Sequence, residues 1–381
     1  MATIKTTTAD VGSFAVIAAS QNLFPSATAF RDLCHLLSPD LRRPATIEGT
    51  RRLDWGAIAA LSQKYNVDPA LGHMLEQGPL RHAVPGSTLQ TLEAALRDNV
   101  VRNLSIKAAA IKISRALNDA AITPVFFKGT AGLLTQLHPS TGFRRQLDID
   151  LMVAPDQEFE ALGVLQAQGY QFCESVNTDN GIELRGTSNP DLQRALLHQF
   201  RHHHHYPPLT CTGQGFSLEL HRHPLPRRWQ HRLTRQLIAS LLEQHDSHGA
   251  RFTVPTPELA IVIAILGKFA SDGGRSRYHF PLPQALDCRA QLNAGGAALD
   301  VTLIESLCGS HYRLFQQLLD QLMAPEAQLS QPDSATRRFL YMMDLKHRRP
   351  SLAALIDRVG YRHQQMRNLL RDPGKLLRPR V

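Results

Sequence analysis

Residues 147–153 read Leu-Asp-Ile-Asp-Leu-Met-Val, a run in which acidic and apolar residues alternate. A period of two is typical of a β-strand that buries one face. Asp148 and Asp150 then project together from one face, about 6.6 Å apart along the chain. The pattern predicts a strand whose other face enters a core through Ile149, Leu151 and Val153.

Two carboxylates on one strand face indicate a site for a divalent cation. Like charges at this spacing repel, and one of them takes up a proton unless a cation lies between them. Mg²⁺ takes oxygen ligands, and two metal ions about 3.5–4 Å apart support in-line phosphoryl or nucleotidyl transfer. The ordinary alternative is that both aspartates only face solvent at a strand edge. The residues in the neighbouring segments are needed to distinguish this alternative from a cation site.

A second predicted strand, residues 122–127, leads directly into Lys128-Gly129-Thr130 and then into a helix that ends near residue 138. Backbone N–H groups at a strand-to-helix turn, together with the positive end of the helix, favour phosphate. We therefore expect Gly129 and Thr130 to lie close to the phosphates of a nucleotide. Lys128 fits a phosphate contact and an ion pair with a carboxylate equally well.

Three further polar residues can complete the site. Arg144 precedes Asp148 by four residues and can contact a phosphate or brace an aspartate. Glu219 lies on a predicted strand, residues 216–220. If that strand neighbours 147–153, Glu219 is about 4.8 Å away laterally and suits a third metal ligand. His221 shares the face of Glu219, where it either orients a substrate or serves as a structural histidine.

The wider pattern predicts an α+β fold with three regions. Short strands and helices alternate between residues 121 and 225, which indicates a small mixed-sheet core; within it, residues 174–215 read as irregular. Residues 1–120 form an N-terminal helical region, and residues 226–381 form a C-terminal helical region. Three features predict helices in the flanking regions. Asp54 has the pattern of a helix N-cap, an apolar stripe follows Ser87 as far as Ile111, and Thr256 and Pro257 have the pattern of a helix N-cap and first residue.

Bulk composition fits a soluble globular protein, with 43 % apolar and 20 % charged residues. No apolar run is long enough for a membrane span, and residues 1–10 lack the apolar region of a secretory signal. The five cysteines are widely spaced without a Cys-x-x-Cys pair. Reduced thiols in a cytoplasmic protein are therefore expected.

The positive charge is concentrated at the C-terminal end. From Arg337 to Val381 there are twelve Lys and Arg against three Asp, a surplus equal to the net charge of +9 for the whole chain. A basic tail can attract nucleic acid or another polyanion. A solvated helical tail that aids solubility is the alternative, since no aromatic-rich binding motif accompanies it.

Several of these segments together resemble the bacterial nucleotidyltransferase-like family within the polymerase-beta nucleotidyltransferase superfamily. The matching segments are Phe127 to Ala131, Arg144, Asp148 to Val153 and Glu219 to His221. Members of the family show a Leu-Lys-Gly stretch, an Arg-x-x-x-Asp-Ile-Asp-Leu-Leu-Val stretch and a later acidic-Leu-His stretch. The resemblance covers about residues 55–223 well and continues loosely through residues 257–266 and Asp287.

The resemblance implies a mixed sheet between helical regions. It implies Asp148 and Asp150 as catalytic metal ligands, Glu219 as the third carboxylate, and Gly129-Thr130 in the phosphate loop. The chain departs from the family pattern in three places. Gly-Ser or Gly-Gly is usual at the phosphate loop, Arg222 replaces a frequent Trp, and Gly267-Lys268-Phe269 replaces a histidine-rich helix that would bind the acceptor.

His202 to His205 form a run that can bind a transition metal or remain without a ligand. In an extended run, alternate histidines face opposite ways, so at most two of them face one ion. The sequence contains no Walker loop, dinucleotide-binding glycine motif, nucleophile elbow or His-Glu-x-x-His.

These observations favour an enzyme that moves a nucleotidyl group from an NTP, with Mg²⁺ or Mn²⁺, to a hydroxyl or amine. The acceptor is open: a small molecule, a peptide, a protein or an RNA that the basic tail attracts. A catalytically inactive binding or regulatory protein on the same scaffold is the second hypothesis. A phosphotransferase that uses the same site is the third.

Overall fold

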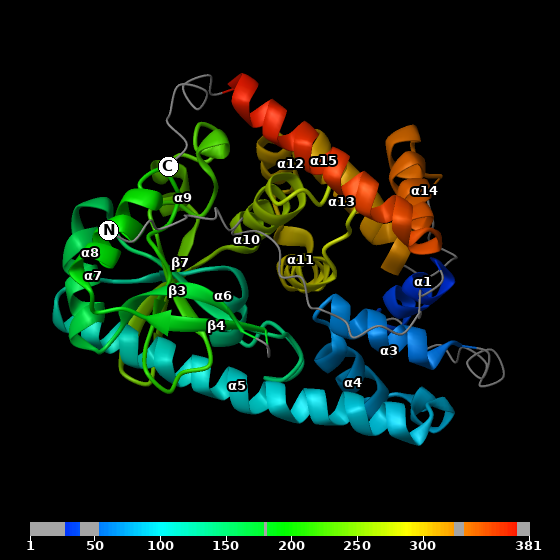
Figure 1. Ribbon diagram of the computed structural model, residues 1–381, viewed down its shortest axis with the longest axis horizontal. Helices are drawn as coiled ribbons and strands as arrows, with labels where there is room; N and C mark the ends of the chain where they lie inside the picture. The colour runs from blue at the N-terminus through cyan, green and yellow to red at the C-terminus, as the bar shows by residue number, and fades with distance from the viewer. Residues whose placement is uncertain (1–26, 39–52, 179–180, 324–330, 372–381) are drawn as a thin grey trace, which may run out of the picture.

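An eight-stranded sheet occupies one half of the computed structural model, which describes residues 27–38, 53–178, 181–323 and 331–371 (Figure 1). The strand order is β4-β3-β5-β6-β2-β1-β8-β7. The molecule is a mixed α+β fold, as predicted. The strands are β1 (Val125–Phe126), β2 (Asp148–Met152), β3 (Gln171–Thr178), β4 (Gly181–Gly186), β5 (Leu209–Thr210), β6 (Ser217–His221), β7 (Leu242–Ser247) and β8 (Ala250–Pro255).

The strand predicted at residues 147–153 is β2, and it lies in the middle of the sheet between β6 and β1. β2 and β6 run parallel, and Asp150 is the register partner of Glu219. β1 runs antiparallel to β2 on its other side. The predicted neighbourhood of the two carboxylate-bearing strands is therefore confirmed.

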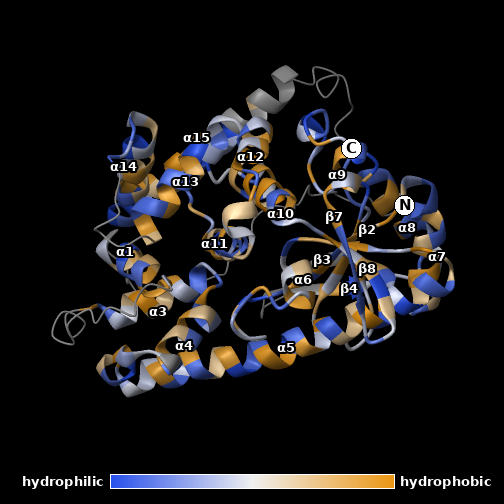
Figure 2. Ribbon diagram, turned by 180° about the vertical axis from the view of Figure 1, so that it is seen from behind, coloured by the Kyte–Doolittle hydropathy of each residue, from blue (hydrophilic) through white to orange (hydrophobic). Residues whose placement is uncertain are grey.

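The face of the sheet opposite the carboxylates is closed by α5 (Gly86–Asp119) and α7 (Glu158–Ala167). Ile149 and Leu151 of β2 are fully buried in one core with residues of α5 such as Ile106. Hydrophobic and hydrophilic positions alternate along α5, as expected for a helix with one apolar face (Figure 2). α5 is much longer than the sheet and continues beneath α4 (Asp68–Gln77), so it joins both halves of the molecule (Figure 1).

The second half of the molecule is helical, and it combines both ends of the chain. α1 (Ala27–Leu36) and α3 (Trp55–Lys64) share one hydrophobic core with α10 to α14. The two predicted flanking regions thus pack into one body. The remaining helices are α6 (Lys128–Leu134), α8 (Pro190–Gln199), α9 (Arg235–Ser240), α10 (Pro257–Ala264), α11 (Leu282–Gly295), α12 (Val301–Cys308), α13 (Ser310–Met323), α14 (Ser334–Arg348) and α15 (Pro350–Arg371).

Short helical segments complete the chain. Single 3₁₀ turns occur at Pro79–Ala83, Pro155–Gln157, Arg227–Trp229 and Gly296–Ala298, and a π-helix at Ile265–Ser271 extends α10. Two predicted helix starts are confirmed. The Asp54 side chain accepts a hydrogen bond from the Ala57 N–H, and Thr256 does the same for the Leu259 N–H.

Two predictions about secondary structure are wrong. Residues 174–215, predicted to be irregular, contain the rest of β3, β4, α8 and β5. The chain from Pro226, predicted to be helical, contains the β7–β8 hairpin, which joins the sheet beside β1. The β3–β4 and β7–β8 hairpins form the two outer parts of the sheet. Their many polar residues obscure the hydrophobic pattern by which a strand is predicted from sequence. The last strand of the sheet therefore ends at Pro255.

The basic C-terminal segment begins as part of the fold. Phe339 and Met343 of α14 are almost fully buried in the helical core. Residues 372–381, which include Lys375, Arg378 and Arg380, lie outside the described residues. Within the described part of the chain, no helix combines the length and the apolar character that a membrane crossing requires.

Candidate active site

Three carboxylates meet on the open face of β2 and β6. Asp148 and Asp150 are two residues apart on β2, and Glu219 is directly opposite Asp150 on β6. Asp150 is almost fully buried, at 2 % exposed, whereas Asp148 and Glu219 are half-buried. The structure thus brings together the three acidic residues that the sequence singles out.

The three negative charges affect one another. Burial, and then the neighbouring Asp150 and Glu219, raise the pKa of Asp148 to about 7. Burial also opposes ionisation of Asp150, but Lys128 and a hydrogen bond from His221 outweigh it and hold the pKa of Asp150 below its usual value. For Glu219, burial is likewise outweighed, by the His221 hydrogen bond and by Lys128, and its pKa is lowered. The cluster carries more negative charge than its own cationic residues balance.

Lys128 contacts the cluster from the junction between β1 and α6. Its Nζ donates to Asp150 Oδ1 at 2.6 Å. The residue has φ = 54°, a left-handed conformation that is unfavourable for a lysine and that recurs at functional sites. Burial lowers the pKa of the Lys128 amine, but the three carboxylates raise it above its usual range, so the side chain is cationic. Of the two predicted roles, the structure contains the ion pair.

His221 lies at the end of β6 and is completely buried. Its Nε2 is 2.9 Å from Asp150 Oδ1 and 3.1 Å from Glu219 Oε2. The edge-to-face contact with Phe127, at 4.8 Å between centroids, fixes the ring plane. Burial and Lys128 act to lower the pKa of His221, but the hydrogen bonds to the two carboxylates prevail and raise it.

Gly129 and Thr130 both lie inside α6, and both are buried. A Cβ on Gly129 would lie 2.0 Å from Nε2 of Gln146, so only glycine allows the Gln146 side chain to pack there. The Thr130 hydroxyl donates to the Asp148 carbonyl at 3.4 Å and accepts from the Asp150 N–H at 3.3 Å. The two residues therefore fix α6 against β2 immediately beside the carboxylates.

Arg144 contacts neither Asp148 nor Asp150 by a hydrogen bond. Its Nε donates to both oxygens of Asp287 on α11, at 3.1 Å each, and His138 Nε2 is 2.9 Å from the same carboxylate. The Arg144 guanidinium is nevertheless close enough to lower the pKa of Asp148. The aspartate that Arg144 contacts is therefore Asp287 of the helical body, not Asp148 or Asp150, and a contact between Arg144 and a phosphate stays a prediction.

The histidine run lies beside the site. The ring centroids of His204 and His205 are 5.4 Å and 5.2 Å from that of His221. Burial is the main cause that lowers the pKa of His204 to about 2 and that of His205 to about 4, so both rings are neutral at pH 7. Among the described residues, the group whose ligand atoms converge for a metal ion is Asp150, Glu219 and His221, not the run itself.

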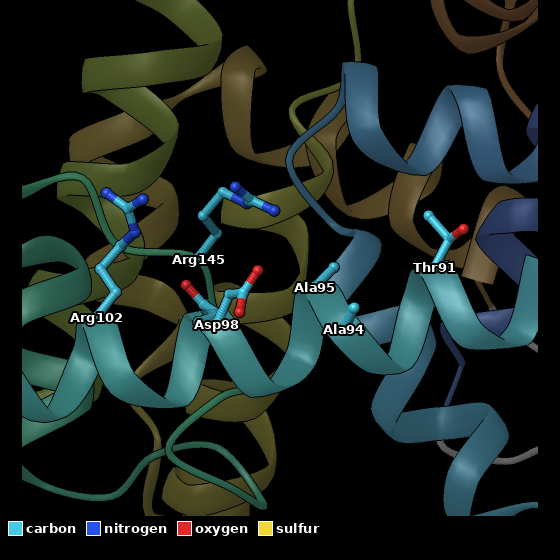
Figure 3. Close-up of a pocket in the computed structure, with 7 residues that line it drawn as sticks. Thr91, Ala94, Ala95, Asp98, Arg102 and Arg145 are labelled. Carbon is cyan, nitrogen blue, oxygen red and sulfur yellow. The ribbon is translucent and has the colours of Figure 1, made fainter.

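A groove of about 420 Å³ is lined by α5 and by the loop that leads into β2 (Figure 3). Arg102 and Asp98 of α5 and Arg145 of the loop line it, above the small side chains of Ala94 and Ala95. Arg145 Nη2 pairs with Asp68 at 2.7 Å. None of the three carboxylates lines this groove, and its lining residues form no hydrogen bond or ion pair with them among the described residues.

Sequence reasoning missed Gln146 and His138 as neighbours of the site, and it did not pair Asp287 with Arg144 or place the rings of His204 and His205 beside His221. Gln146 had a usable signal, because it continues the two-residue alternation of Asp148 and Asp150. His138 and Asp287 are 149 residues apart in sequence, and only the packing of α11 against the loop before β2 brings them together.

Two comparisons relate the chain to known proteins. A protein family described as "Uncharacterised nucleotidyltransferase" matches residues 51–308. The chain is also similar to the crystal structure of an antigenic nucleotidyltransferase-like protein from Paracoccidioides brasiliensis. The similarity has a TM-score of 0.31 and 12 % identity, and it covers 59 % of this chain and 95 % of that one. Curated protein sequences give no match. Since the family match spans most of the chain and includes every carboxylate of the site, the chain belongs to this nucleotidyltransferase family.

Proposed function

We propose that the protein transfers a nucleotidyl group from an NTP to a hydroxyl or amine acceptor, with a divalent metal ion at Asp148, Asp150 and Glu219. The observation that carries the proposal is the register of β2 and β6. It places three carboxylates on one face in a chain whose family is a nucleotidyltransferase family. Such a set is suited to binding the metal complex of a triphosphate.

The residues fit a divalent cation. Burial, and then the charges of Asp150 and Glu219, raise the pKa of Asp148 to about 7. Lys128 and His221 both contact Asp150 Oδ1, and no hydrogen bond from the described residues reaches the Asp148 carboxylate. A divalent ion held by the three carboxylates would supply positive charge there and would offset the charge of a triphosphate.

The chain's own residues bind and align the reactants in this proposal. Asp148, Asp150 and Glu219 hold the metal-bound triphosphate against β2. The Lys128 amine pairs with Asp150, and the lysine side chain is 39 % exposed, so the same amine can also contact a phosphate oxygen. Arg144, fixed by Asp287, adds a positive charge on the side of Asp148.

The reaction is an in-line displacement at the α-phosphorus. The acceptor oxygen or nitrogen forms a bond to phosphorus, the bond to the pyrophosphate oxygen breaks, and the acceptor releases a proton to water. Geometry and charge stabilisation are the main contributions of a protein to this chemistry.

The test is to incubate the purified protein with each NTP, labelled at the α-phosphate, together with Mg²⁺ or Mn²⁺ and a cell lysate. Transfer of the α-label to a lysate component, and its loss in Asp148→Asn and Asp150→Asn, is the expected result. Transfer of a γ-label instead of the α-label would establish the phosphotransferase. Metal-dependent NTP binding without transfer of either label would establish the inactive binding protein.

A further inference from the structure

We propose that His221 is a direct ligand of the divalent ion, through Nε2, and that the site consequently prefers a first-row transition ion such as Mn²⁺ to Mg²⁺. The inference rests on the proposed function, since it concerns the ion at the same carboxylates. It changes the ligand set from three oxygen donors to a mixed set that includes one nitrogen.

The distances fit a shared ion. Ligand bonds of about 2.1 Å that meet at right angles place neighbouring ligand atoms about 3.0 Å apart. His221 Nε2 is 2.9 Å from Asp150 Oδ1 and 3.1 Å from Glu219 Oε2. All three ligand atoms lie within 4.8 Å of one another. One ion can therefore contact all three atoms with small adjustments of the side chains.

The burial of His221 points to the same role. The side chain is 0 % exposed, and its Nδ1 is buried without a hydrogen-bond partner. The polar contacts of the ring are thus the two carboxylates, both through Nε2. A buried polar atom without a hydrogen-bond partner destabilises the fold, so this imidazole is kept beside the carboxylates at a cost to stability.

The ring orientation is fixed before any ion binds. The backbone of His221 is held in β6 by its register with Met152, and Phe127 packs edge-to-face against the ring. Once Nε2 has lost its proton, its lone pair points where its N–H pointed, between the two carboxylates. No large movement is needed for ligation.

A nitrogen ligand changes which ion binds best. Mg²⁺ strongly prefers oxygen and retains water, whereas first-row transition ions accept an imidazole nitrogen more readily, Mn²⁺ least among them and the later ions most. Asp150 Oδ1 also accepts from Lys128, so an ion here competes with a cationic side chain. An ion with an additional nitrogen bond has an advantage in that competition that Mg²⁺ lacks.

The experiment uses the full-length protein and Mn²⁺ as the probe. Mn²⁺ binding is titrated by EPR, Mg²⁺ is added as a competitor, and pulsed EPR records nitrogen coupling to the bound Mn²⁺. We expect a directly bound ¹⁴N, its replacement by ¹⁵N when the protein is grown on ¹⁵N-histidine, and Mn²⁺ affinity at least about tenfold above that of Mg²⁺.

Two variants assign the nitrogen. His221→Gln can still donate a hydrogen bond to the carboxylates but has no imidazole, so it should lose the nitrogen coupling and most of the Mn²⁺ preference. His204→Gln removes the neighbouring ring, 5.4 Å away, and should retain both. The wild-type isotope measurement does not depend on how well either variant folds.

The possible failures differ. Bound Mn²⁺ that is lost in Asp150→Asn but shows no histidine nitrogen in the wild type would overturn the inference and leave the proposed function intact. Nitrogen coupling that disappears in His204→Gln instead would also overturn it. Absence of all Mn²⁺ and Mg²⁺ binding, with or without NTP, would remove the proposed metal-dependent function as well.

Discussion

Lys128 Nζ lies 2.6 Å from Asp150 Oδ1, and a left-handed backbone conformation at Lys128 places it there. The aspartate is nearly inaccessible, whereas the lysine side chain is 39 % exposed. The pair therefore connects the buried part of the carboxylate cluster to the surface from which the proposed triphosphate would approach.

Replacement of this lysine should make the cluster more dependent on metal. In Lys128→Met the Asp150 charge loses its cationic partner. We expect a loss of about 1–2 kcal/mol in the free energy of unfolding, less than for a fully buried pair because the lysine is partly exposed. Added Mg²⁺ or Mn²⁺ should raise the melting temperature of the variant more than that of the wild type, and differential scanning fluorimetry measures both. If metal raised the melting temperatures of Lys128→Met and the wild type equally, the Lys128 amine would not compete with the ion for the same position.

Removal of one carboxylate should abolish transfer. Asp150→Asn retains the shape of the side chain but removes a charge from the metal site. Loss of an outer partner of a metal ligand alone costs 10–100-fold, so loss of the ligand should reduce label transfer by more than about 100-fold. Asp156→Asn, at an exposed aspartate just after β2, is the matched control and should leave transfer unchanged. Substantial transfer by Asp150→Asn would contradict the three-carboxylate site.

The arrangement of the carboxylates was predictable because strand alternation is a local property. Asp148 and Asp150 share a face whatever the rest of the fold does, and the same alternation places Glu219 and His221 together on β6. The partners of Arg144 were not predictable in this way. Asp287 belongs to a helix that follows the sheet by about thirty residues, and only tertiary packing brings it to Arg144.

The limits of the sheet were harder to predict than its centre. Four of the five residues of β2 are buried and its sequence has a clear period of two, whereas β7 carries mostly polar side chains and has no buried residue. β7 belongs to the sheet because it pairs with β8, which itself pairs with β1. Propensity and hydrophobic pattern contain no information about such a partner.

The close contact between Gly129 and Gln146 gives a prediction about stability. A Cβ on Gly129 would lie 2.0 Å from Nε2 of the buried Gln146 side chain, so Gly129→Ala should cost about 1–3 kcal/mol. Gly163→Ala in α7 is the control. Nothing lies within 4 Å of the added Cβ there, and the change should stabilise by about 0.5–1 kcal/mol. Urea unfolding measures both.

A double mutant tests the cause. In Gly129→Ala/Gln146→Ala the obstructing side chain is absent, so the second substitution should recover part of the loss. Additive costs of the two single changes would show that the defect of Gly129→Ala has another origin.

The helical body contains a histidine that should make stability depend on pH. His347 stacks on Phe30 at 4.9 Å. Burial lowers its pKa to about 4, with a further lowering by Lys64 that Asp344 opposes, and a smaller one by Lys346. The unfolded chain binds this proton near pH 6.5, before the folded protein does. The stabilisation is therefore complete above about pH 6.5 and is lost as the pH falls towards 4.

His347→Phe should reduce this dependence. Between pH 7 and pH 5 the wild type should lose up to about 2 kcal/mol through this group, and the variant should lose that much less. His231→Phe, at an exposed histidine, should leave the slope of stability against pH as it is in the wild type. Melting temperatures from pH 7 to pH 5 measure the difference, and parallel curves for wild type and His347→Phe would contradict the assignment.

Arg144 and Asp287 should behave as one unit that connects the helical body to the catalytic face. Both side chains are partly buried, at 14 % and 18 % exposed, and Arg144 Nε donates to both oxygens of Asp287. Arg144→Ala removes a positive charge near Asp148 and should lower label transfer about 10–100-fold for every acceptor alike. Asp287→Asn should lower it in the same direction, because the arginine loses its partner. The double variant should be no worse than Arg144→Ala, with a coupling of about 0.5–3 kcal/mol in both stability and transfer.

Arg145→Ala is a stringent control, since the adjacent arginine pairs with Asp68 at 2.7 Å and lines the groove beside α5. It should reduce stability through the loss of that pair while transfer by the folded protein remains near that of the wild type. Independent, additive effects of the Arg144 and Asp287 changes on transfer would show that α11 does not position the arginine for the reaction.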